Sequence, residues 1–146
     1  MNSILLDTNV LSELMHTSPE QAVIDWFGRH LDDIFYISAI TQAEIRYGIA
    51  VLPAGKRRDM LAISAEVMFS QRFAGRCLPF DEKCTANYAA VRADRRRAGQ
   101  EVSTEDAMIA AVALSYGFSL ATRNTKDFLY IEGLILHNPW QVLSVL

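Results

Sequence analysis

Apolar and polar positions follow two different periods in this chain, and stretches of the two kinds alternate from end to end. Short apolar runs, several of them rich in aromatic and β-branched residues, are typical of buried strands. They predict strands at residues 3–6, 32–38, 76–80, 118–122 and, together with a turn, 134–140. Between these runs, apolar residues recur at helical spacing. That spacing predicts helices at residues 9–15, 19–27, 39–52, 56–72, 83–98 and 103–116, and a short helix within 124–131.

The ends of the predicted helices carry signals of their own. Ser18 and Pro19 are typical of an N-cap followed by proline at the first helical position. A Pro-Ala-Gly sequence stops the third helix, and Gly99 and Gly117 are suited to left-handed C-caps. Strands that alternate with helices favour a parallel sheet covered on both faces. We therefore predict a single α/β domain over residues 1–146, a three-layer α/β/α sandwich with a mainly parallel sheet.

Composition limits the class of protein. With 146 residues, of which 51% are hydrophobic and 21% charged, the chain is long enough for one well-packed core. A formal net charge of −3 argues against a strong non-specific nucleic-acid binder, although it is compatible with a local basic patch. Cys77 and Cys84 match neither a CxxC redox pair nor a zinc half-site, so we expect reduced thiols. No leader-like segment and no apolar run of spanning length occur, which predicts a cytoplasmic protein without a membrane segment.

The first predicted strand ends at Asp7, an ionisable residue between two apolar runs. A lone buried carboxylate is costly unless something pairs with it. Ligands of open parallel sheets bind beyond the carboxyl ends of the strands. Other polar residues follow predicted strands or lie early in predicted helices, namely Glu44, Asp106, Asn124 and Asp127. We therefore expect these side chains and Asp7 to share one rim of the sheet.

Each of these positions also has a purely structural interpretation. Asp7 or Asn9 can cap the helix that follows, and residues 41–44 and 103–106 approximate capping boxes. Asn124 with Asp127 can cap a short helix in the same way. Capping explains each position separately, but it does not explain a cluster. Carboxylates gathered on one rim raise each other's pKa, so clustering has no structural benefit without a cation.

The chemistry of the predicted cluster indicates a hard cation. Oxygen ligands without histidine or cysteine favour Mg²⁺ or Mn²⁺ over zinc. Asp106 opens an almost wholly apolar helix, which must be deeply buried and would hold the carboxylate rigidly. A carboxylate-bound magnesium ion activates water and stabilises the charge that develops in a phosphodiester displacement. The acids therefore favour metal-dependent cleavage of a phosphodiester.

Four segments occur in a characteristic order along essentially the whole chain. They are LLDTNVL (5–11), AITQAEIRYGI (39–49), STEDAMIAAVAL (103–114) and LATRNTKDF followed by IEGLILHNPW (120–140). As an ordered set they resemble the PIN-domain family, and within it the VapC/FitB-type toxin ribonucleases. The resemblance implies an α/β/α fold and a Mg²⁺- or Mn²⁺-dependent endoribonuclease. It also implies a toxin that acts on RNA, is silenced by a cognate antitoxin, commonly forms a homodimer, and meets operator DNA only through the antitoxin.

The resemblance also assigns roles to individual residues. The three acids of the family match Asp7, Glu44 and Asp106, which become the expected catalytic residues and metal ligands. Its fourth catalytic position, aspartate or asparagine, matches Asn124. Supporting positions are Thr8, Asn9 and Asp127. The first two match residues that usually orient the first acid, and the last either supplies a carboxylate through a water molecule or only caps.

Binding of RNA needs basic side chains near the metal. Arg123 directly precedes the fourth site position and is the first candidate for a phosphate contact. The densest basic stretch, residues 92–97, lies on the helix before the one that carries Asp106. We expect Arg95 and Arg96 to contact RNA, although arginines in a last helical turn also complement the helix dipole without any ligand.

A docking surface for the antitoxin has one candidate in the sequence. Phe69 and Phe73 lie one helical turn apart and either form an apolar patch for a partner helix or pack in the core. We expect the antitoxin to be a short, partly disordered chain that lays a helix along an apolar groove. It should direct a basic side chain towards the acids.

Three other functions fit parts of the sequence. A HAD-like phosphatase also places an aspartate after its first strand, but it needs a second aspartate where this chain has Asn9. A nucleotide-binding module needs a glycine-rich turn, and residues 6–11 contain no glycine. A catalytically inert PIN-like interaction module would keep the fold and act through protein partners alone. The presence of all three acids favours the nuclease, and metal-dependent RNA cleavage by purified protein would separate the two.

Overall fold

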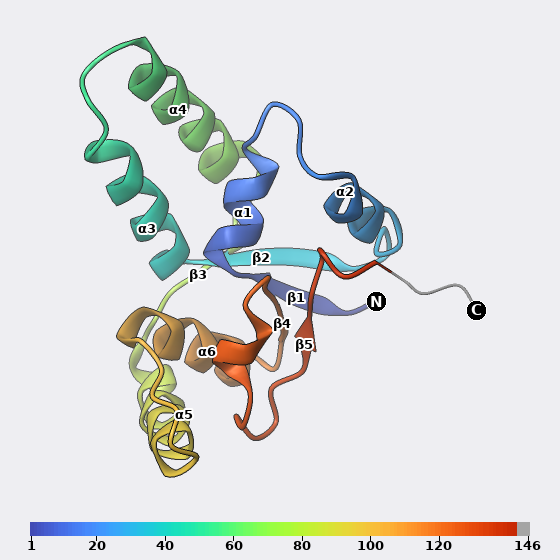
Figure 1. Ribbon diagram of the computed structural model, residues 1–146, viewed down its shortest axis with the longest axis vertical. Helices are drawn as coiled ribbons and strands as arrows, with labels where there is room; N and C mark the ends of the chain where they lie inside the picture. Colours follow the sequence, from blue (N-terminus) through green and yellow to red (C-terminus); the bar gives the residue numbers. More distant parts are fainter. Residues whose placement is uncertain (143–146) are drawn as a thin grey trace.

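The computed structural model describes residues 1–142, which form a parallel sheet with helices on both faces (Figure 1). Its strands are β1 (Ser3–Leu6), β2 (Ile34–Ser38), β3 (Cys77–Leu78), β4 (Ser119–Ala121) and β5 (Leu136–His137). The order across the sheet is β3-β2-β1-β4-β5, and every neighbouring pair is parallel. The predicted α/β/α architecture is therefore confirmed. The strand that ends at Asp7 lies in the middle of the sheet.

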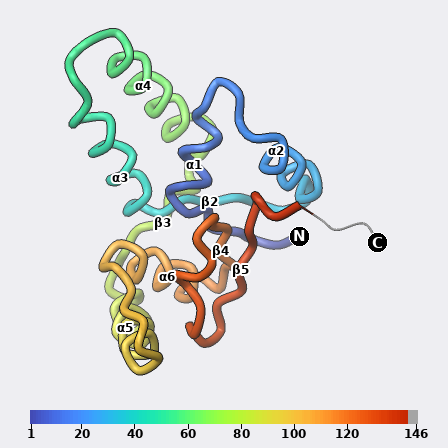
Figure 2. Tube along the Cα trace, viewed as in Figure 1, coloured from blue at the N-terminus to red at the C-terminus, as the bar shows by residue number. Residues whose placement is uncertain are grey.

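The helices divide between the two faces of the sheet. They are α1 (Thr8–Leu14), α2 (Gln21–Gly28), α3 (Ala39–Ala50), α4 (Lys56–Val67), α5 (Thr85–Arg97) and α6 (Thr104–Tyr116). Shorter pieces are a π-helical turn η1 (Met68–Arg72) and the 3-10 turns η2 (Glu82–Cys84) and η3 (Thr125–Phe128). In Figure 1, α1 to α4 lie above the sheet and α5 and α6 below it. Figure 2 follows the chain from the upper layer through β3 into the lower layer.

Alternating side chains of the strands build two hydrophobic cores. Ile4 and Leu6 of β1 face the core shared with α1 to α4, whereas Leu5 faces the core shared with α5 and α6. The lower core is dominated by α6, where Ala107, Ala110 and other small residues are fully buried. Small side chains allow the helix to lie close against the sheet. The first turn of α6, which carries Asp106, is thus fixed at the carboxyl ends of the strands.

Several element boundaries differ from those that periodicity predicts. The second helix begins at Gln21 without a side-chain cap, so the predicted Ser18 cap is wrong. The predicted helix at 56–72 is α-helical only to Val67 and continues as η1. Phe69 and Phe73 are only 7% and 6% exposed and pack in the upper core. Of the two alternatives for these phenylalanines, core packing is confirmed and the docking patch is wrong.

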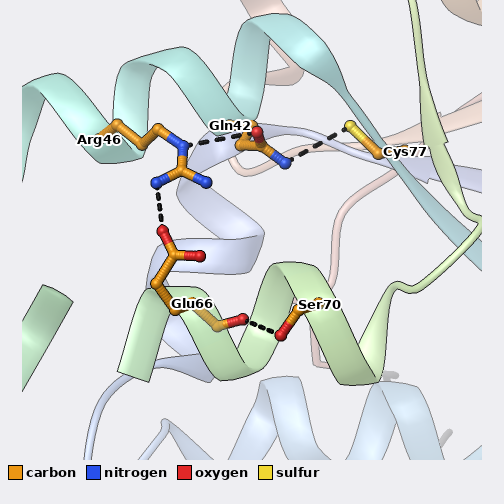
Figure 3. Close-up of polar contacts among 5 residues, drawn as sticks. All are labelled: Gln42, Arg46, Glu66, Ser70 and Cys77. Carbon is orange, nitrogen blue, oxygen red and sulfur yellow. Dashed lines mark hydrogen bonds and ion pairs between the residues drawn. The ribbon is translucent and has the colours of Figure 1, made fainter. Parts of the chain in front are cut away.

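A set of polar contacts joins α3 to the end of α4 (Figure 3). Arg46 forms an ion pair with Glu66 and a hydrogen bond from Nε to Gln42 Oε1 of 3.4 Å. The amide of Gln42 reaches Cys77 Sγ at 3.8 Å, and the hydroxyl of Ser70 donates to the Glu66 carbonyl at 2.6 Å. These contacts engage Arg46 away from the carboxylate rim, although it lies only two residues past Glu44.

Two expectations about thiols and membranes can be compared with the structure. Cys77 and Cys84 are both free, as their spacing predicts. Across residues 1–142, no helix combines the length and the apolar character that crossing a bilayer would require.

Two glycines should respond in opposite ways to alanine. Gly117 ends α6 at φ 72°, so Gly117→Ala forces a side chain into the left-handed region. We expect it to lower the free energy of unfolding by about 1 kcal/mol. Gly28→Ala is the matched control, because an added Cβ there meets no atom within 4 Å. It should leave stability equal or slightly higher. Urea denaturation measures both, and equal losses would contradict the prediction.

Candidate active site

Asp7 lies at the junction of β1 and α1, and only 5% of its surface is exposed. Its carboxylate accepts hydrogen bonds from the Thr8 backbone N–H at 2.8 Å and from the Thr122 hydroxyl at 2.7 Å. The amide of Asn9 lies 3.5 Å from the Asp7 carboxylate and 3.5 Å from the Thr122 hydroxyl. Asp7 therefore caps α1, as the structural interpretation predicts. The same contacts fix its carboxylate at the rim of the sheet.

Glu44 occupies the second turn of α3 and caps nothing. The helix begins directly at the end of β2, where the Ser38 hydroxyl accepts a hydrogen bond from the Thr41 N–H at 3.1 Å. The Thr8 hydroxyl lies 2.6 Å from Glu44 Oε1 and 3.0 Å from the Thr41 hydroxyl. The capping-box interpretation of residues 41–44 is thus wrong. The Glu44 side chain instead turns towards the residue that follows Asp7.

Asp106 lies in the first turn of α6 and is half-buried. The Ser103 hydroxyl accepts a hydrogen bond from the Asp106 N–H at 3.1 Å, so the predicted cap at Ser103 is confirmed. The pKa of Asp106 is raised from 3.8 to about 6, first by burial and then by repulsion from Asp7, Asp127 and Glu44. Three carboxylates from separate parts of the chain therefore act on Asp106.

The pKa of Asp7 is raised as well. Burial is the largest cause, and the negative charges of Glu44 and Asp127 add to it. Hydrogen bonds from Thr122 and Thr8 lower the pKa but do not cancel the effect of burial. The charges of Glu44 and Asp127 therefore act on the buried carboxylate of Asp7.

The fourth position has two candidates, Asn124 just before η3 and Asp127 within it. Asn124 precedes this turn and makes no side-chain cap, so the capping interpretation gains no support there. Its backbone N–H donates to the Thr122 hydroxyl at 3.1 Å, and its carbonyl accepts from the Asp127 N–H at 3.0 Å. Asn124 is exposed, whereas the charge of Asp127 affects both Asp7 and Asp106. Asp127 is therefore the residue of η3 that contributes to the electrostatics of the rim.

The donor set suits a hard cation by its chemistry. Carboxylate oxygens are preferred ligands of Mg²⁺ and Mn²⁺, and a bound cation would relieve the repulsion that raises the pKa of Asp106. Within residues 1–142, however, no three histidine, cysteine or carboxylate side chains are arranged so that they could hold an ion. The Glu44 carboxylate is engaged by Thr8 instead. The residue types therefore suit a metal ion, but in residues 1–142 their side chains do not converge on one coordination site.

The basic residues predicted to bind RNA lie in different environments. Arg123 is exposed beside the acids, its backbone N–H bonded to Asn9 Oδ1 at 3.3 Å and its guanidinium 5.0 Å from the Trp140 ring centre. Arg96 is exposed on α5. Arg95 is only 4% exposed, so the prediction that it contacts RNA is wrong. Its guanidinium turns inward, towards main-chain oxygens near η3.

Thr122 is the site residue that sequence reasoning missed. It is fully buried just after β4, and its hydroxyl contacts Asp7, Asn9 and the backbone of Asn124. The available signal was its position: Thr122 is the first polar residue after a strand that pairs with the strand ending at Asp7. A threonine that follows an apolar strand has no distinctive charge, which is why it was overlooked.

The sequence was also compared with known proteins. It matches the PIN domain model over residues 4–134. The chain belongs to the PIN-domain family. It is 47% identical to the plasmid stability protein StbB of Pseudomonas syringae, over 94% of this chain and 99% of the relative. It is 42% identical to the VapC ribonuclease Y4jK of Sinorhizobium fredii and 40% identical to the toxin FitB of Neisseria gonorrhoeae, each over 94% of this chain and 98% of the relative.

Solved structures of PIN-domain proteins share the fold. The structure of FitAB bound to an IR36 DNA fragment matches with a TM-score of 0.86 and 40% identity, over 97% of this chain and 98% of that one. VapBC2 of Rickettsia felis, bound to a DNA fragment from its promoter, matches with a TM-score of 0.78 and 26% identity, over 93% and 98%. Membership of the PIN-domain family decides against the HAD-like phosphatase and the nucleotide-binding module.

The raised pKa of Asp106 predicts how stability depends on pH without metal. The folded protein holds this proton up to about pH 6, whereas the unfolded chain releases it near 3.8. Between these values the folded state binds more protons, so this residue's contribution to stability falls as pH rises. Asp106→Asn removes the effect. Relative to wild type, the variant should gain stability between about pH 4 and pH 6 and keep that gain above pH 6.

The gain should be on the order of 1–2 kcal/mol, less than the full linkage value because Asp106 is partly exposed. Urea denaturation of metal-free protein at several pH values measures it. A difference between variant and wild type that does not change with pH would contradict the prediction.

Proposed function

We propose that this PIN-domain protein is a Mg²⁺- or Mn²⁺-dependent endoribonuclease and the toxin of a toxin–antitoxin pair. The observation that carries the proposal is the group of acids at the carboxyl ends of the central strands. There the charges of Glu44 and Asp127 help to raise the pKa of Asp7 and that of Asp106. Relatives named VapC ribonuclease and toxin FitB, at 42% and 40% identity over nearly the whole chain, support it. An inert interaction module offers no reason to keep carboxylates that repel one another.

Each group at the rim has a role in this proposal. Asp7, Glu44 and Asp106 would hold the cation, with Asn124 or Asp127 completing the set. A bound metal of this kind supplies an activated water and neutralises charge on the phosphate. The Thr122 hydroxyl holds the Asp7 carboxylate in place, and the Thr8 hydroxyl does the same for Glu44. Both contacts reduce the side-chain freedom that would be lost on binding.

Arg123 is the candidate for holding the RNA backbone. Its main chain is tied to Asn9, next to the acids, while its side chain is exposed. Stacking on Trp140 limits the positions of the guanidinium without neutralising its charge. A phosphate contact at this position would place the RNA backbone beside the acids. Arg96, exposed on α5, stays a candidate for a more distant contact.

A groove between α1 and α3 is suited to an antitoxin helix. It has a volume of about 390 Å³ and apolar walls that include Met15, Ile45 and Ile49. Thr8 and Glu44 line the same groove, so it opens onto the acid rim. A helix with an apolar face would fill it, and a basic side chain at its end would meet the acids. The solved complexes FitAB and VapBC2 show that related chains assemble with partners.

The other expected properties remain part of the proposal. Exposed apolar side chains on α3 and α4, among them Tyr47, Met60 and Ile63, support a homodimer through this helix pair, which projects from the body of the molecule in Figure 1. The protein would act on RNA in the cytoplasm. Contact with operator DNA would be made by the antitoxin.

Isosteric variants separate capping from metal chemistry. Glu44→Gln and Asp106→Asn remove charge and keep a side-chain oxygen as acceptor. Asp7→Asn can still accept from the Thr8 N–H, but it replaces the oxygen that accepts from the Thr122 hydroxyl by a donor. Without metal, Glu44→Gln and Asp106→Asn should fold at least as well as wild type, because one source of repulsion is gone, whereas in Asp7→Asn this gain is offset by the lost hydrogen bond. Each should lose the rise in melting temperature that millimolar Mg²⁺ or Mn²⁺ produces through linkage. Each should also lose cleavage of single-stranded RNA by about 100-fold or more.

Two further variants serve as comparisons in the same assays. Glu105→Gln removes an exposed carboxylate from the same turn as Asp106 and should keep both metal stabilisation and cleavage. Asn124→Ala should cost less than the three charge-removing variants. The proposal fails if correctly folded Asp7→Asn, Glu44→Gln and Asp106→Asn retain wild-type metal-dependent cleavage.

Gly48 offers a position at which a larger side chain would enter the antitoxin groove. Gly48 lines it, and an added Cβ there meets no atom within 4 Å. Induced expression of the wild-type protein should stop growth, and co-expression of the cognate antitoxin should restore it. Gly48→Leu should stop growth but resist rescue, whereas Gly28→Leu on α2 should be rescued like wild type. Normal growth on expression of soluble wild-type protein would refute the toxin assignment, and full rescue of Gly48→Leu would refute the groove.

A further inference from the structure

Arg95 is a buried arginine without a carboxylate partner in residues 1–142. It lies in the last turn of α5 with 4% of its surface exposed, and it takes part in none of the ion pairs of the described residues. Its Nη1 lies 3.2 Å from the Lys126 carbonyl, 3.1 Å from the Leu129 carbonyl and 3.4 Å from Gln100 Oε1. Its Nε is buried without any partner. Burying a cation in this way is costly, and an apolar side chain would fill the same space more cheaply.

Arg95 is buried, whereas the next two arginines of α5 are exposed. Arg96 and Arg97 are exposed in the same last turn, where they complement the helix dipole without burial. Arg97 also lies 3.6 Å from Asp94. The dipole therefore does not require a third arginine that turns inward. The burial of Arg95 has to be explained by what its guanidinium contacts.

The two carbonyls that Arg95 contacts lie on either side of Asp127. Lys126 belongs to η3 and Leu129 follows it, so the guanidinium fixes this turn from the inside. The next residue, Tyr130, has φ 64°, a left-handed conformation that is unfavourable for a tyrosine. Buried Phe128 anchors the same segment in the lower core. A four-residue turn next to a strained residue has few internal hydrogen bonds, and Arg95 supplies two from outside.

We propose that Arg95 is a positioning residue for the candidate active site. Its guanidinium holds η3 in place, and η3 holds Asn124 and Asp127 beside Asp7 and Asp106. The consequence for metal binding rests on the proposed function, whereas the effect on η3 itself does not. Arg95 touches neither the acids nor RNA in this role and acts only through the turn.

Amide hydrogen exchange of the metal-free protein tests the effect on η3. In wild type the amides of Asn124 and Asp127 are hydrogen-bonded and should exchange slowly. In Arg95→Met they should exchange about tenfold faster or more, because a charge-assisted contact to the turn is lost. Amides of β1 and α6 should keep their wild-type rates. Arg96→Met, which removes the same charge from the exposed face of α5, should leave all of these rates unchanged.

A second measurement tests whether loss of the Arg95 contacts to η3 weakens metal binding. Calorimetric titration with Mn²⁺ should show affinity about tenfold weaker in Arg95→Met than in wild type. In an Asp127→Asn background the same substitution should cost less, because part of its effect passes through Asp127. Arg95→Lys keeps the charge but lacks the planar fork, and it should fall between Met and wild type. If Arg95→Met does not fold, hydrogen exchange and Mn²⁺ affinity are both measured on Arg95→Lys instead.

The outcomes distinguish this inference from the proposed function. Unchanged exchange at Asn124 and Asp127 in the arginine variants would overturn it, and so would faster exchange spread evenly over β1 and α6. An equal loss of Mn²⁺ affinity with and without Asp127 would also overturn it. Wild-type protein that binds no metal and cleaves no RNA would refute the proposed function. The exchange result would still decide whether Arg95 positions η3.

Discussion

The hydrogen bond from the Thr122 hydroxyl to the Asp7 carboxylate joins residues 115 positions apart and ties the ends of two central strands together. A buried carboxylate must be satisfied from several directions, and at Asp7 this need organises the rim. Its neighbour Thr8 extends the network to Glu44 on α3. Thr122 extends it in the other direction, to the backbone of Asn124 and thus to η3. One acid in the middle of a parallel sheet is thus connected to Glu44 and to the start of η3, whereas the packing of α6 fixes Asp106.

This arrangement is electrostatically unfavourable for the metal-free protein. Burial and the charges of neighbouring carboxylates raise the pKa of Asp7 and that of Asp106, the latter to about 6. The fold tolerates the repulsion because other parts of the chain supply stability. The alanines of α6 are fully buried against the sheet, and β1 pairs with strands on both sides. The apolar core therefore provides the stability, whereas the acid rim lowers it in the metal-free protein. Positive charge of either kind, a bound cation or a basic side chain of a partner, relieves the same repulsion.

The parts predicted correctly from the sequence are those where local pattern and tertiary environment agree. Strands and helices alternate visibly, and Asp7 and Asp106 stand where a strand ends or a helix begins. The capping box predicted at residues 41–44 was wrong because Ser38, the last residue of β2, caps α3, which puts Glu44 in the second turn. Arg95 was predicted to contact RNA because it lies in the densest basic stretch of the chain, residues 92–97. Its spacing from Tyr88 and Val91 places it on the apolar face of α5, and that periodicity was the clue that outweighed its charge.

The groove between α1 and α3 lies where the two proposed ligands, the metal ion and the antitoxin helix, would meet. Thr8 and Glu44 belong both to the acid rim and to the wall of the groove between α1 and α3. A helix lying in that groove would end beside the carboxylates without any rearrangement of the sheet. A basic side chain placed there neutralises the charge that a metal ion would otherwise neutralise. The two ligands then compete for the same electrostatic stabilisation, so each must weaken binding of the other by the same factor. Inhibition by the partner would follow from charge as much as from blocked access.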